Sequence, residues 1–367
     1  MAVVRIDRSS FGTGGQVKLS FDLMTGSLRL QRMQELARDA KAAGFSGLVM
    51  TEVGRTAYLG CAAAALAADL DILTGVAVAF PRSPMITAQL AWELADASNG
   101  RFRLGIGTQV RAHIERRYGA EFDSPGPRLR EYVLAVRAVF AAFRGDVPLT
   151  HEGKFWDLSL LPASWSPGPI AAPDPPIDIA AVNPWMLRMA GEVADGVHVH
   201  PLNTPAYLRD TVMPNIVAGA IAAGREPADL QVIVPTFAAP GATSDEVHMW
   251  REMARTQVAF YGSTPNYAFI FEQVGREDIT PRLRERQKAG DLTGMAAVID
   301  DDLLDHFCVS GEWTEVAEEL IQRYQGTATR VVSYFAGLAW TRDRKALGPW
   351  GELAKTLRQA SSTVPSP

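Results

Sequence analysis

Cysteine is scarce in this sequence: the 367-residue chain contains two, Cys61 and Cys308. They lie far apart in stretches that look helical, so neither a disulfide framework nor a zinc site is indicated and we expect no metal. The expected state is two buried thiols in a reducing compartment.

Long hydrophobic runs are also missing. No window holds eighteen uninterrupted apolar residues, and the alanine-rich stretch 61–70 is short and carries acids near its end. The N-terminal residues have no sustained apolar segment of the signal-peptide type. We therefore expect a soluble cytoplasmic protein with no membrane partner.

Neither sign of charge dominates. The chain has 36 Lys and Arg against 41 Asp and Glu, for a formal net charge of −5. The basic residues are scattered, whereas a nucleic-acid binder needs a clustered basic face, so a nucleic-acid partner is not expected. The hydrophobic content of 47% is ample for a large core.

Short apolar runs alternate with amphipathic stretches along the chain. Strands are predicted at 17–23, 45–52, 71–80, 101–107, 177–182, 195–201, 230–239 and 328–337. Helices are predicted at 28–44, 56–68, 85–100, 128–143, 184–194, 207–224, 244–262, 313–326 and 342–358. Eight very apolar strands, each followed by a helix, predict an α/β fold of the (β/α)8 TIM-barrel type, with an open Rossmann-like sheet as the alternative.

Two stretches break this rhythm. Residues 147–177 are rich in proline and polar residues, with a hairpin predicted around 151–155, and residues 263–310 are less regular. We expect one domain over 1–367, with insertion regions near the carboxyl-terminal mouth of the barrel and 263–306 covering the site.

The stretch RFRLGIGTQV at 101–110 places two glycines after a strand, but it is not a dinucleotide fingerprint. Gly105 and Gly107 fit the first two positions, whereas Val110 breaks the third and no strand with a terminal acid follows. In a barrel, loops after the strands build the site, so Gly107 and Thr108 would lie close to a ligand. Arg111, His113, Arg116 and Arg117 follow; they either approach a phosphate or form a solvated helix face.

The stretches 35–52, 74–119, 175–201 and 309–335 together resemble the bacterial-luciferase-like superfamily. Within it, LGIGTQVRAHIERRYG is most similar to the actinobacterial oxidoreductases that use the deazaflavin coenzyme F420. The resemblance implies a (β/α)8 barrel that binds a flavin or deazaflavin at its carboxyl-terminal mouth. It also implies a homodimer, and the apolar helix at 56–68 is a candidate for burial against a partner.

The resemblance assigns the cofactor site residue by residue. It places a non-proline cis peptide, pressed behind the cofactor ring, at Gly75–Val76. It places the cofactor phosphate between two loops, after the fourth strand and before the helix that follows the fifth. The residues implied there are Gly107, Thr108, Gln109, His113, Ala181, Val182 and Asn183. Related chains often carry glycines in the second loop, where this one has AAVNP.

Four residues are candidates for chemistry at the mouth. Glu52 ends the second strand, where relatives carry a polar residue near the ring; the alternative is a structural role such as helix capping. The histidine usual after it is absent. Asp22 is predicted to end the first strand. His198 and His200 lie two apart on one strand and would share a face, as proton donor or substrate contact or as satisfied buried histidines.

These observations favour an F420-dependent oxidoreductase that transfers a hydride between the deazaflavin and a small organic substrate. The alternatives are an FMN-dependent monooxygenase of the same superfamily that uses oxygen, and a barrel that binds a flavin-like ligand without turnover.

Overall fold

The structure is a computed structural model, and it describes residues 19–26 and 28–360 of the chain. The contacts divide the chain into two compact units. Unit 1 comprises the described parts of Met1–Met24, Val199–Pro214 and Ile233–Pro367, and unit 2 comprises those of Thr25–His198 and Asn215–Val232. The expectation of one domain over 1–367 stays a prediction.

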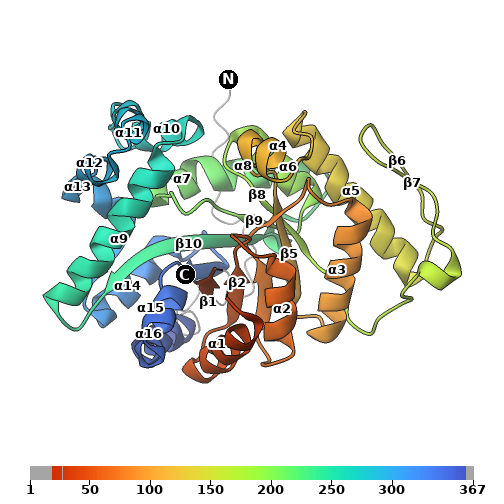
Figure 1. The fold of residues 1–367 in the computed structure, drawn as a ribbon, viewed down its shortest axis with the longest axis horizontal. Helices are drawn as coiled ribbons and strands as arrows, with labels where there is room; N and C mark the ends of the chain where they lie inside the picture. Colours follow the sequence, from red (N-terminus) through yellow and green to blue (C-terminus); the bar gives the residue numbers. More distant parts are fainter. Residues whose placement is uncertain (1–18, 27, 361–367) are drawn as a thin grey trace. The chain divides into compact units, whose positions relative to one another are not determined.

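Unit 2 holds a parallel sheet with helices between its strands (Figure 1). Its strands pair in the order β2-β3-β5-β8-β9, and β4 pairs with β5. The strands are β2 (Gly47–Met50), β3 (Asp71–Thr74), β4 (Ala77–Val78), β5 (Phe102–Gly107), β8 (Ile177–Ala180) and β9 (Gly196–His198). The helices are α1 (Leu30–Ala43), α2 (Ala57–Ala65), α3 (Pro84–Ala97), α4 (Arg111–Arg117), α5 (Pro125–Arg144), α6 (Pro184–Val193) and α8 (Met213–Ala222).

Unit 1 holds four further parallel strands, in the order β11-β10-β12-β1. They are β1 (Ser20–Thr25), β10 (Gln231–Pro240), β11 (Cys308–Gly311) and β12 (Arg330–Ser333). Its helices are α7 (Pro205–Tyr207), α9 (Ser244–Gly262), α10 (Ala268–Glu272), α11 (Ile279–Lys288), α12 (Leu292–Ala297), α13 (Asp301–Asp305), α14 (Trp313–Tyr324), α15 (Ala336–Arg342) and α16 (Leu347–Ala360).

Eight parallel strands, each followed by a helical segment, make the fold a (β/α)8 barrel, as the alternation predicted. These strands are β1, β2, β3, β5, β8, β9, β10 and β12. Each overlaps one predicted strand, although residues 17 and 18 of the first prediction lie outside the described residues. The predicted strand at 328–337 is shorter than expected, because α15 already begins at Ala336.

Helix α1 illustrates how the sequence specifies these elements. Met33, Leu36, Ala37 and Ala40 recur at helical spacing and are its buried residues. The helix ends at Gly44, which has a left-handed φ of 103° and whose N–H bonds back to the carbonyl groups of the last turn. A left-handed residue at this position lets N–H groups reach these carbonyls and is most favourable for glycine, so the predicted helix end is confirmed.

The irregular stretch after α5 contains the predicted hairpin. β6 (His151–Glu152) and β7 (Asp157–Leu158) pair antiparallel, and in Figure 1 they lie on the outer side of α5. Glu131 of α5 accepts the backbone N–H groups of Lys154, Phe155 and Trp156, at 2.7–2.9 Å. One carboxylate therefore fixes the hairpin turn onto the helix.

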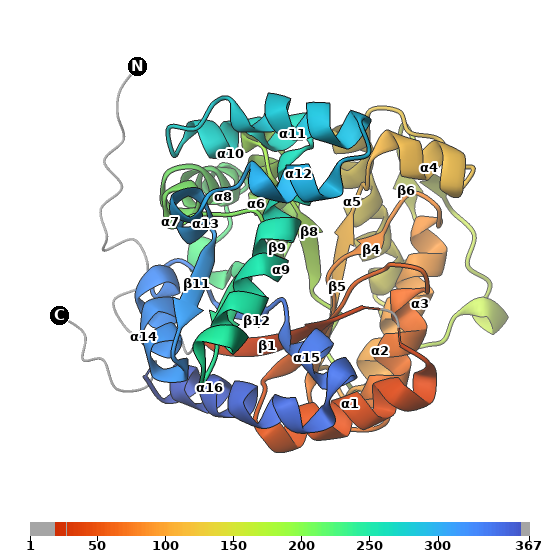
Figure 2. The same ribbon diagram turned by 60° about the vertical axis from the view of Figure 1, so that its left-hand side comes forward.

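The expectation of a less regular stretch at 263–310 was wrong. It contains α10 to α13 and strand β11, with α11, α12 and α13 packed against α9 (Figure 2). These helices are short, and side chains close their ends: Asp291 and Asp300 each accept an N–H of the following turn. Arg251 and Arg255 of α9 both bind Asp301. Helix caps and ion pairs between residues far apart in the chain are not visible as hydrophobic periodicity, which is the main sequence signal for a helix.

Two kinds of feature are absent from the part of the chain that the structure describes. None of its helices combines the length and apolar character needed to cross a membrane. No three His, Cys, Asp or Glu side chains within 19–26 and 28–360 are grouped to hold a metal ion. Cys61 and Cys308 are both buried and unbridged.

Candidate functional site

The peptide bond between Gly75 and Val76 is cis, at the position that the resemblance predicted. It lies between β3 and β4, which both pair with β5. Gly75 and Val76 are half-buried, whereas Thr74 before them and Ala77 after them are buried. The bulge between β3 and β4 therefore offers accessible surface at the carboxyl ends of the strands in unit 2.

His198 fills the space behind this bulge. A Cβ added to Gly105 would lie 2.5 Å from His198 Nε2 and 2.0 Å from the carbonyl oxygen of Thr74. A Cβ added to Gly75 would lie 2.2 Å from Val49 Cγ1 and 3.3 Å from His198 Cε1. The imidazole thus occupies room that two glycines leave open, and it is only 5% exposed. Of the two roles predicted for His198, this placement favours the buried one.

A buried ion pair lies beside this histidine. Asp178 of β8 is fully buried and accepts from Arg103 of β5, Nε at 2.9 Å and Nη2 at 2.5 Å. Its Oδ2 is 4.0 Å from His198 Nε2. The sequence analysis missed Arg103 and Asp178, although a charged residue in each of two very apolar strands was a signal that could have found them.

Glu52 holds the chain that follows the bulge. Its carboxylate accepts the backbone N–H of Val78 at 2.7 Å and both terminal nitrogens of Arg82, at 2.5 and 3.0 Å. The glutamate side chain is 4% exposed. Of the two readings of Glu52, the structure favours the structural one. The partner Arg82 was not recognised from the sequence.

Replacing Glu52 by glutamine is expected to destabilise unit 2 by about 2 kcal/mol. The amide oxygen still accepts from Val78, but the half-buried Arg82 loses its counter-charge. Urea unfolding followed by circular dichroism measures the change. Glu115→Gln is the matched control, because its pair with Arg111 is exposed and should contribute no more than about 0.5 kcal/mol. Equal effects of the two substitutions would contradict the structural role of the Glu52–Arg82 ion pair.

The two predicted phosphate loops leave the same edge of the sheet. β5 and β8 are parallel neighbours, with Ile106 opposite Ile179, so residues 107–109 and 181–183 follow adjacent strand ends. Residue 181 is buried, 182 is half-buried and 183 is exposed. The structure therefore brings together the two segments that the resemblance assigned to the cofactor phosphate.

The first of these loops packs against the bulge. A Cβ on Gly107 would lie 3.0 Å from Val76 Cγ2 and 3.4 Å from Ala180 Cβ. Gln109 has a left-handed φ of 57°, and its Oε1 accepts the N–H of the next residue. Thr108 is half-buried and donates its hydroxyl to the Gln109 carbonyl at 3.0 Å. This turn is fixed by its own side chains.

The second loop ends in the first turn of α6. Asn183 accepts the N–H of Met186 at 3.0 Å, and the N–H of Leu187 bonds to the Asn183 carbonyl. Pro184, the first helical residue, has no N–H. Among the described residues, Trp185 thus keeps the first-turn N–H that is left for an anion. The AAVNP sequence gives a weaker anion site than a glycine-rich loop.

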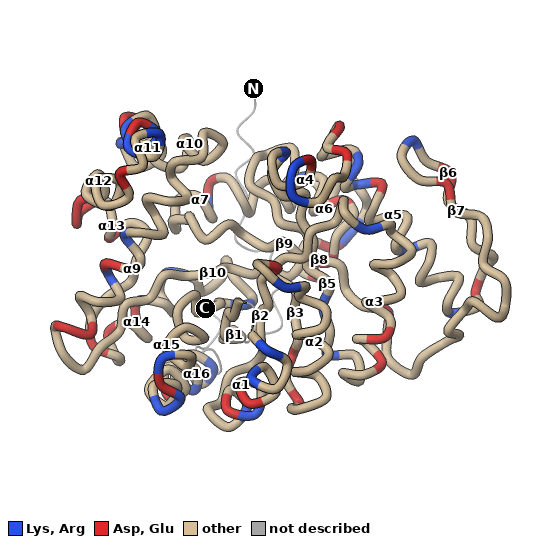
Figure 3. Tube along the Cα trace, in the orientation of Figure 1, with Lys and Arg blue, Asp and Glu red and all other residues tan. Residues whose placement is uncertain are grey.

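Helix α4 carries the basic residues that follow the first loop, and Figure 3 shows the positive charge along it. Arg111, His113, Arg116 and Arg117 are all exposed. Arg111 is paired with Glu115 at 2.6 Å. Within the described residues, His113 makes no side-chain hydrogen bond to either phosphate loop. The solvated-face interpretation fits this helix better than a phosphate contact.

Asp22 does not end its strand, because β1 continues to Thr25. Its two carboxylate oxygens accept from Arg330, Nε at 2.7 Å and Nη2 at 2.8 Å, and Asp22 is fully buried. Arg330 is the first residue of β12, which runs parallel to β1. The carboxylate therefore points toward the amino-terminal end of β12. The predicted position of Asp22 at the carboxyl-terminal mouth was wrong.

His200 lies beyond the end of β9, so the alternation within a strand does not extend to it. It belongs to unit 1, where its ring packs against Tyr261 and Tyr267. His198 belongs to unit 2. The two histidines predicted to share one face of a strand therefore have separate surroundings.

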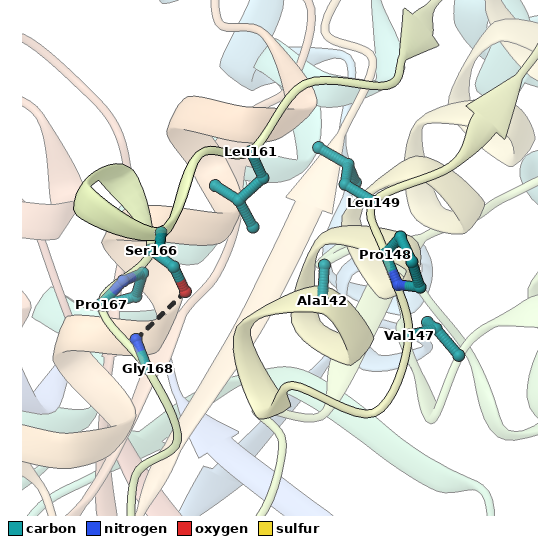
Figure 4. A pocket seen from close by; sticks show the side chains of 9 residues that line it. Ala142, Val147, Pro148, Leu149, Leu161, Ser166, Pro167 and Gly168 are labelled. Carbon is teal, nitrogen blue, oxygen red and sulfur yellow. Dashed lines mark hydrogen bonds between the residues drawn. The ribbon is translucent and has the colours of Figure 1, made fainter.

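A hollow of about 440 Å³ lies on the outer side of α5 (Figure 4). Ser166 accepts the Gly168 N–H at one wall, and Trp92 donates to the Gly168 carbonyl. Its lining residues are Ala142, Val147, Pro148, Leu149, Leu161, Ala163, Ser166, Pro167 and Gly168. None of them was predicted for the cofactor or for chemistry.

The luciferase-like monooxygenase family matches residues 11–330. An uncharacterised protein of Mycobacterium tuberculosis is 36% identical over 325 residues, which cover 88% of this chain and 95% of that protein. The fold resembles the coenzyme F420-dependent tetrahydromethanopterin reductase of Methanopyrus kandleri, with a TM-score of 0.74, 22% identity, and 91% and 98% of the two chains covered.

A second solved structure with this fold is a type II Baeyer-Villiger monooxygenase encoded on a Pseudomonas putida plasmid, in complex with FMN. Its TM-score is 0.67 at 18% identity, and 95% of this chain and 100% of that chain are covered. The match to the family spans most of the sequence. This chain therefore belongs to the luciferase-like monooxygenase family.

Proposed function

We propose that this protein is an F420-dependent oxidoreductase that transfers a hydride between the deazaflavin and a small organic substrate. The observation that carries the proposal is the accessible bulge at Gly75–Val76 between β3 and β4, which both pair with β5. The neighbouring strands β5 and β8 lead into the two phosphate loops. When bound, the deazaflavin supplies the hydride chemistry.

The residues present fit such a cofactor. The bulge at Gly75–Val76 is accessible for an aromatic ring; His198 packs against Gly75, and Glu52 holds Val78 just after the bulge. Next to it, Trp185 has a helix N–H that suits a phosphate, and the Thr108 hydroxyl could donate to a phosphate oxygen by turning away from the Gln109 carbonyl. Ring and phosphate surfaces thus adjoin in unit 2.

The reductase with the same fold supports F420 over FMN, because it is a coenzyme F420-dependent enzyme and its TM-score is the higher of the two. The FMN-containing monooxygenase keeps the second candidate open. A barrel that binds the cofactor without turnover is the third. A substrate-dependent change in cofactor absorbance excludes the non-catalytic candidate, and an oxygen requirement identifies the monooxygenase.

Titration of the purified protein with oxidised F420 and with FMN, followed by fluorescence, tests the proposal. We expect F420 to bind at least about tenfold more tightly. Thr108→Val should weaken F420 binding about three- to tenfold through a lost hydrogen bond, and Thr150→Val, in an exposed loop, should not. Tighter binding of FMN would identify FMN as the cofactor. If neither compound binds, the proposed cofactor site is wrong.

A further inference from the structure

A cluster of polar aromatic side chains lies in unit 1, apart from every residue used above except His200. Gln257 and Tyr261 come from α9, Tyr267 from the turn after it, and Tyr334 from the end of β12. His200 follows β9. All five residues are half-buried, so each keeps some accessible surface.

The structure fixes the tautomer of His200. Its Nδ1 accepts the N–H of Leu202 at 3.1 Å, so this nitrogen carries no proton. Burial lowers the pKa of His200 to about 3, which keeps the ring neutral near pH 7. The proton is therefore on Nε2, which has no hydrogen-bond partner among the described residues. His200 presents one fixed donor.

The loop that carries His200 is rigidly held. Asn203 is buried and its Nδ2 donates to the carbonyl groups of His200, Pro201 and Pro235, at 2.9, 3.2 and 2.9 Å. These bonds join the loop to β10. The position of the His200 ring is set before any ligand arrives, which favours recognition because little ordering remains.

Aromatic rings surround the donor. The His200 ring centroid is 4.1 Å from that of Tyr267 and 4.7 Å from that of Tyr261. The hydroxyls of Tyr261 and Tyr334 are 2.7 Å apart, and Tyr334 donates to Gln257 at 3.3 Å. Burial raises the pKa of Tyr267 to about 12, and that of Tyr261 also lies above its usual range. The cluster is therefore uncharged.

The charged residues nearby on α9 are already engaged. Arg251 binds Asp301 and Asp305, and Arg255 binds Glu252 and Asp301. Both arginines of α9 are thus matched by carboxylates, so neither is available to attract a carboxylate or phosphate to the cluster. The fixed His200 donor among neutral rings suits an uncharged molecule with an oxygen acceptor.

We propose that this cluster binds the oxygen of an uncharged carbonyl or alcohol substrate, with His200 Nε2–H donating to that oxygen and Tyr267 contacting the apolar part. The inference rests on the proposed function, because the bound molecule is a substrate only if the protein is the proposed oxidoreductase. Binding itself is independent of the cofactor and is tested separately.

Two substitutions separate ligand binding from a structural role. His200→Asn keeps an oxygen that can accept from Leu202 but removes the Nε2 donor, whereas His200→Gln keeps a donor near Nε2 and loses the acceptor. With cyclohexanone as the probe, we expect Asn to weaken binding about three- to tenfold and Gln to retain most of it. If His200 is only structural, the bond from Leu202 matters most, so Gln should lower binding and melting temperature more than Asn does. That result would overturn the proposal.

Nuclear magnetic resonance of the full chain labelled with ¹⁵N-histidine supplies the direct readout. The His200 signals, assigned by their loss in the variants, should show a proton on Nε2 and should shift with cyclohexanone but not with cyclohexanecarboxylate. His248→Asn, an exposed change on α9, is the control. Equal shifts with both probes, or none with cyclohexanone, reject the proposal. Shifts without any F420 binding would sink the proposed function and leave this site standing.

Discussion

Asp22→Asn is expected to lower the free energy of unfolding by about 3–5 kcal/mol, because it removes the carboxylate charge from a buried ion pair with Arg330. Both carboxylate oxygens are used by Arg330, and the asparagine side chain would turn a donor toward one of its nitrogens. Asp22 has no exposed surface, so water cannot replace the lost contact. Urea unfolding followed by circular dichroism and tryptophan fluorescence measures the loss.

The double variant Asp22→Leu/Arg330→Met should recover most of that stability, because replacing a buried pair by apolar groups is often neutral. Asp278→Asn is the matched surface control: its pair with Arg282 is exposed, so the expected change is below about 1 kcal/mol. A stable Asp22→Asn protein that has lost activity would contradict the structural role and return this residue to the chemistry.

Gly105→Ala is expected to destabilise unit 2 by about 3 kcal/mol or more, at the upper end for overpacked cores. The new methyl group would lie 2.0 Å from the Thr74 carbonyl oxygen and 2.5 Å from His198 Nε2. Thr74 cannot easily move away from Gly105, because its hydroxyl donates to the Gly105 carbonyl at 2.7 Å and accepts the Gly105 N–H at 2.9 Å. Thermal and urea unfolding of the purified variant measure the effect.

Gly348→Ala is the control for this substitution. Gly348 lies in α16 with open space around it, so alanine there should be neutral or slightly stabilising. Adding His198→Ala to Gly105→Ala removes one of the two clashes and should restore part of the stability. If Gly105→Ala unfolds like the unsubstituted protein, the packing of His198 between two glycines is not as described.

The sequence predicted the barrel because eight apolar runs and their helices repeat regularly, and each run matches a strand. It failed where structure depends on partners far along the chain. β11 is four residues long and extends a sheet through its pairing with β10. The short helices after α9 are held by caps and by Arg251 and Arg255, and neither leaves an apolar period.

For the candidate site, the sequence and its resemblance proposed the segments, and the tertiary structure showed which of their charged side chains are paired. The cis peptide at Gly75–Val76 was found where expected. Whether a carboxylate can act, however, depends on what lies across from it. Glu52 is occupied by Arg82, and Asp22 by Arg330, which is 308 residues away in the chain. The sequence around an acidic residue near a strand end does not show whether the carboxylate is free or paired. Coulomb attraction depends on distance in space, and the fold brings the partner close from anywhere in the chain.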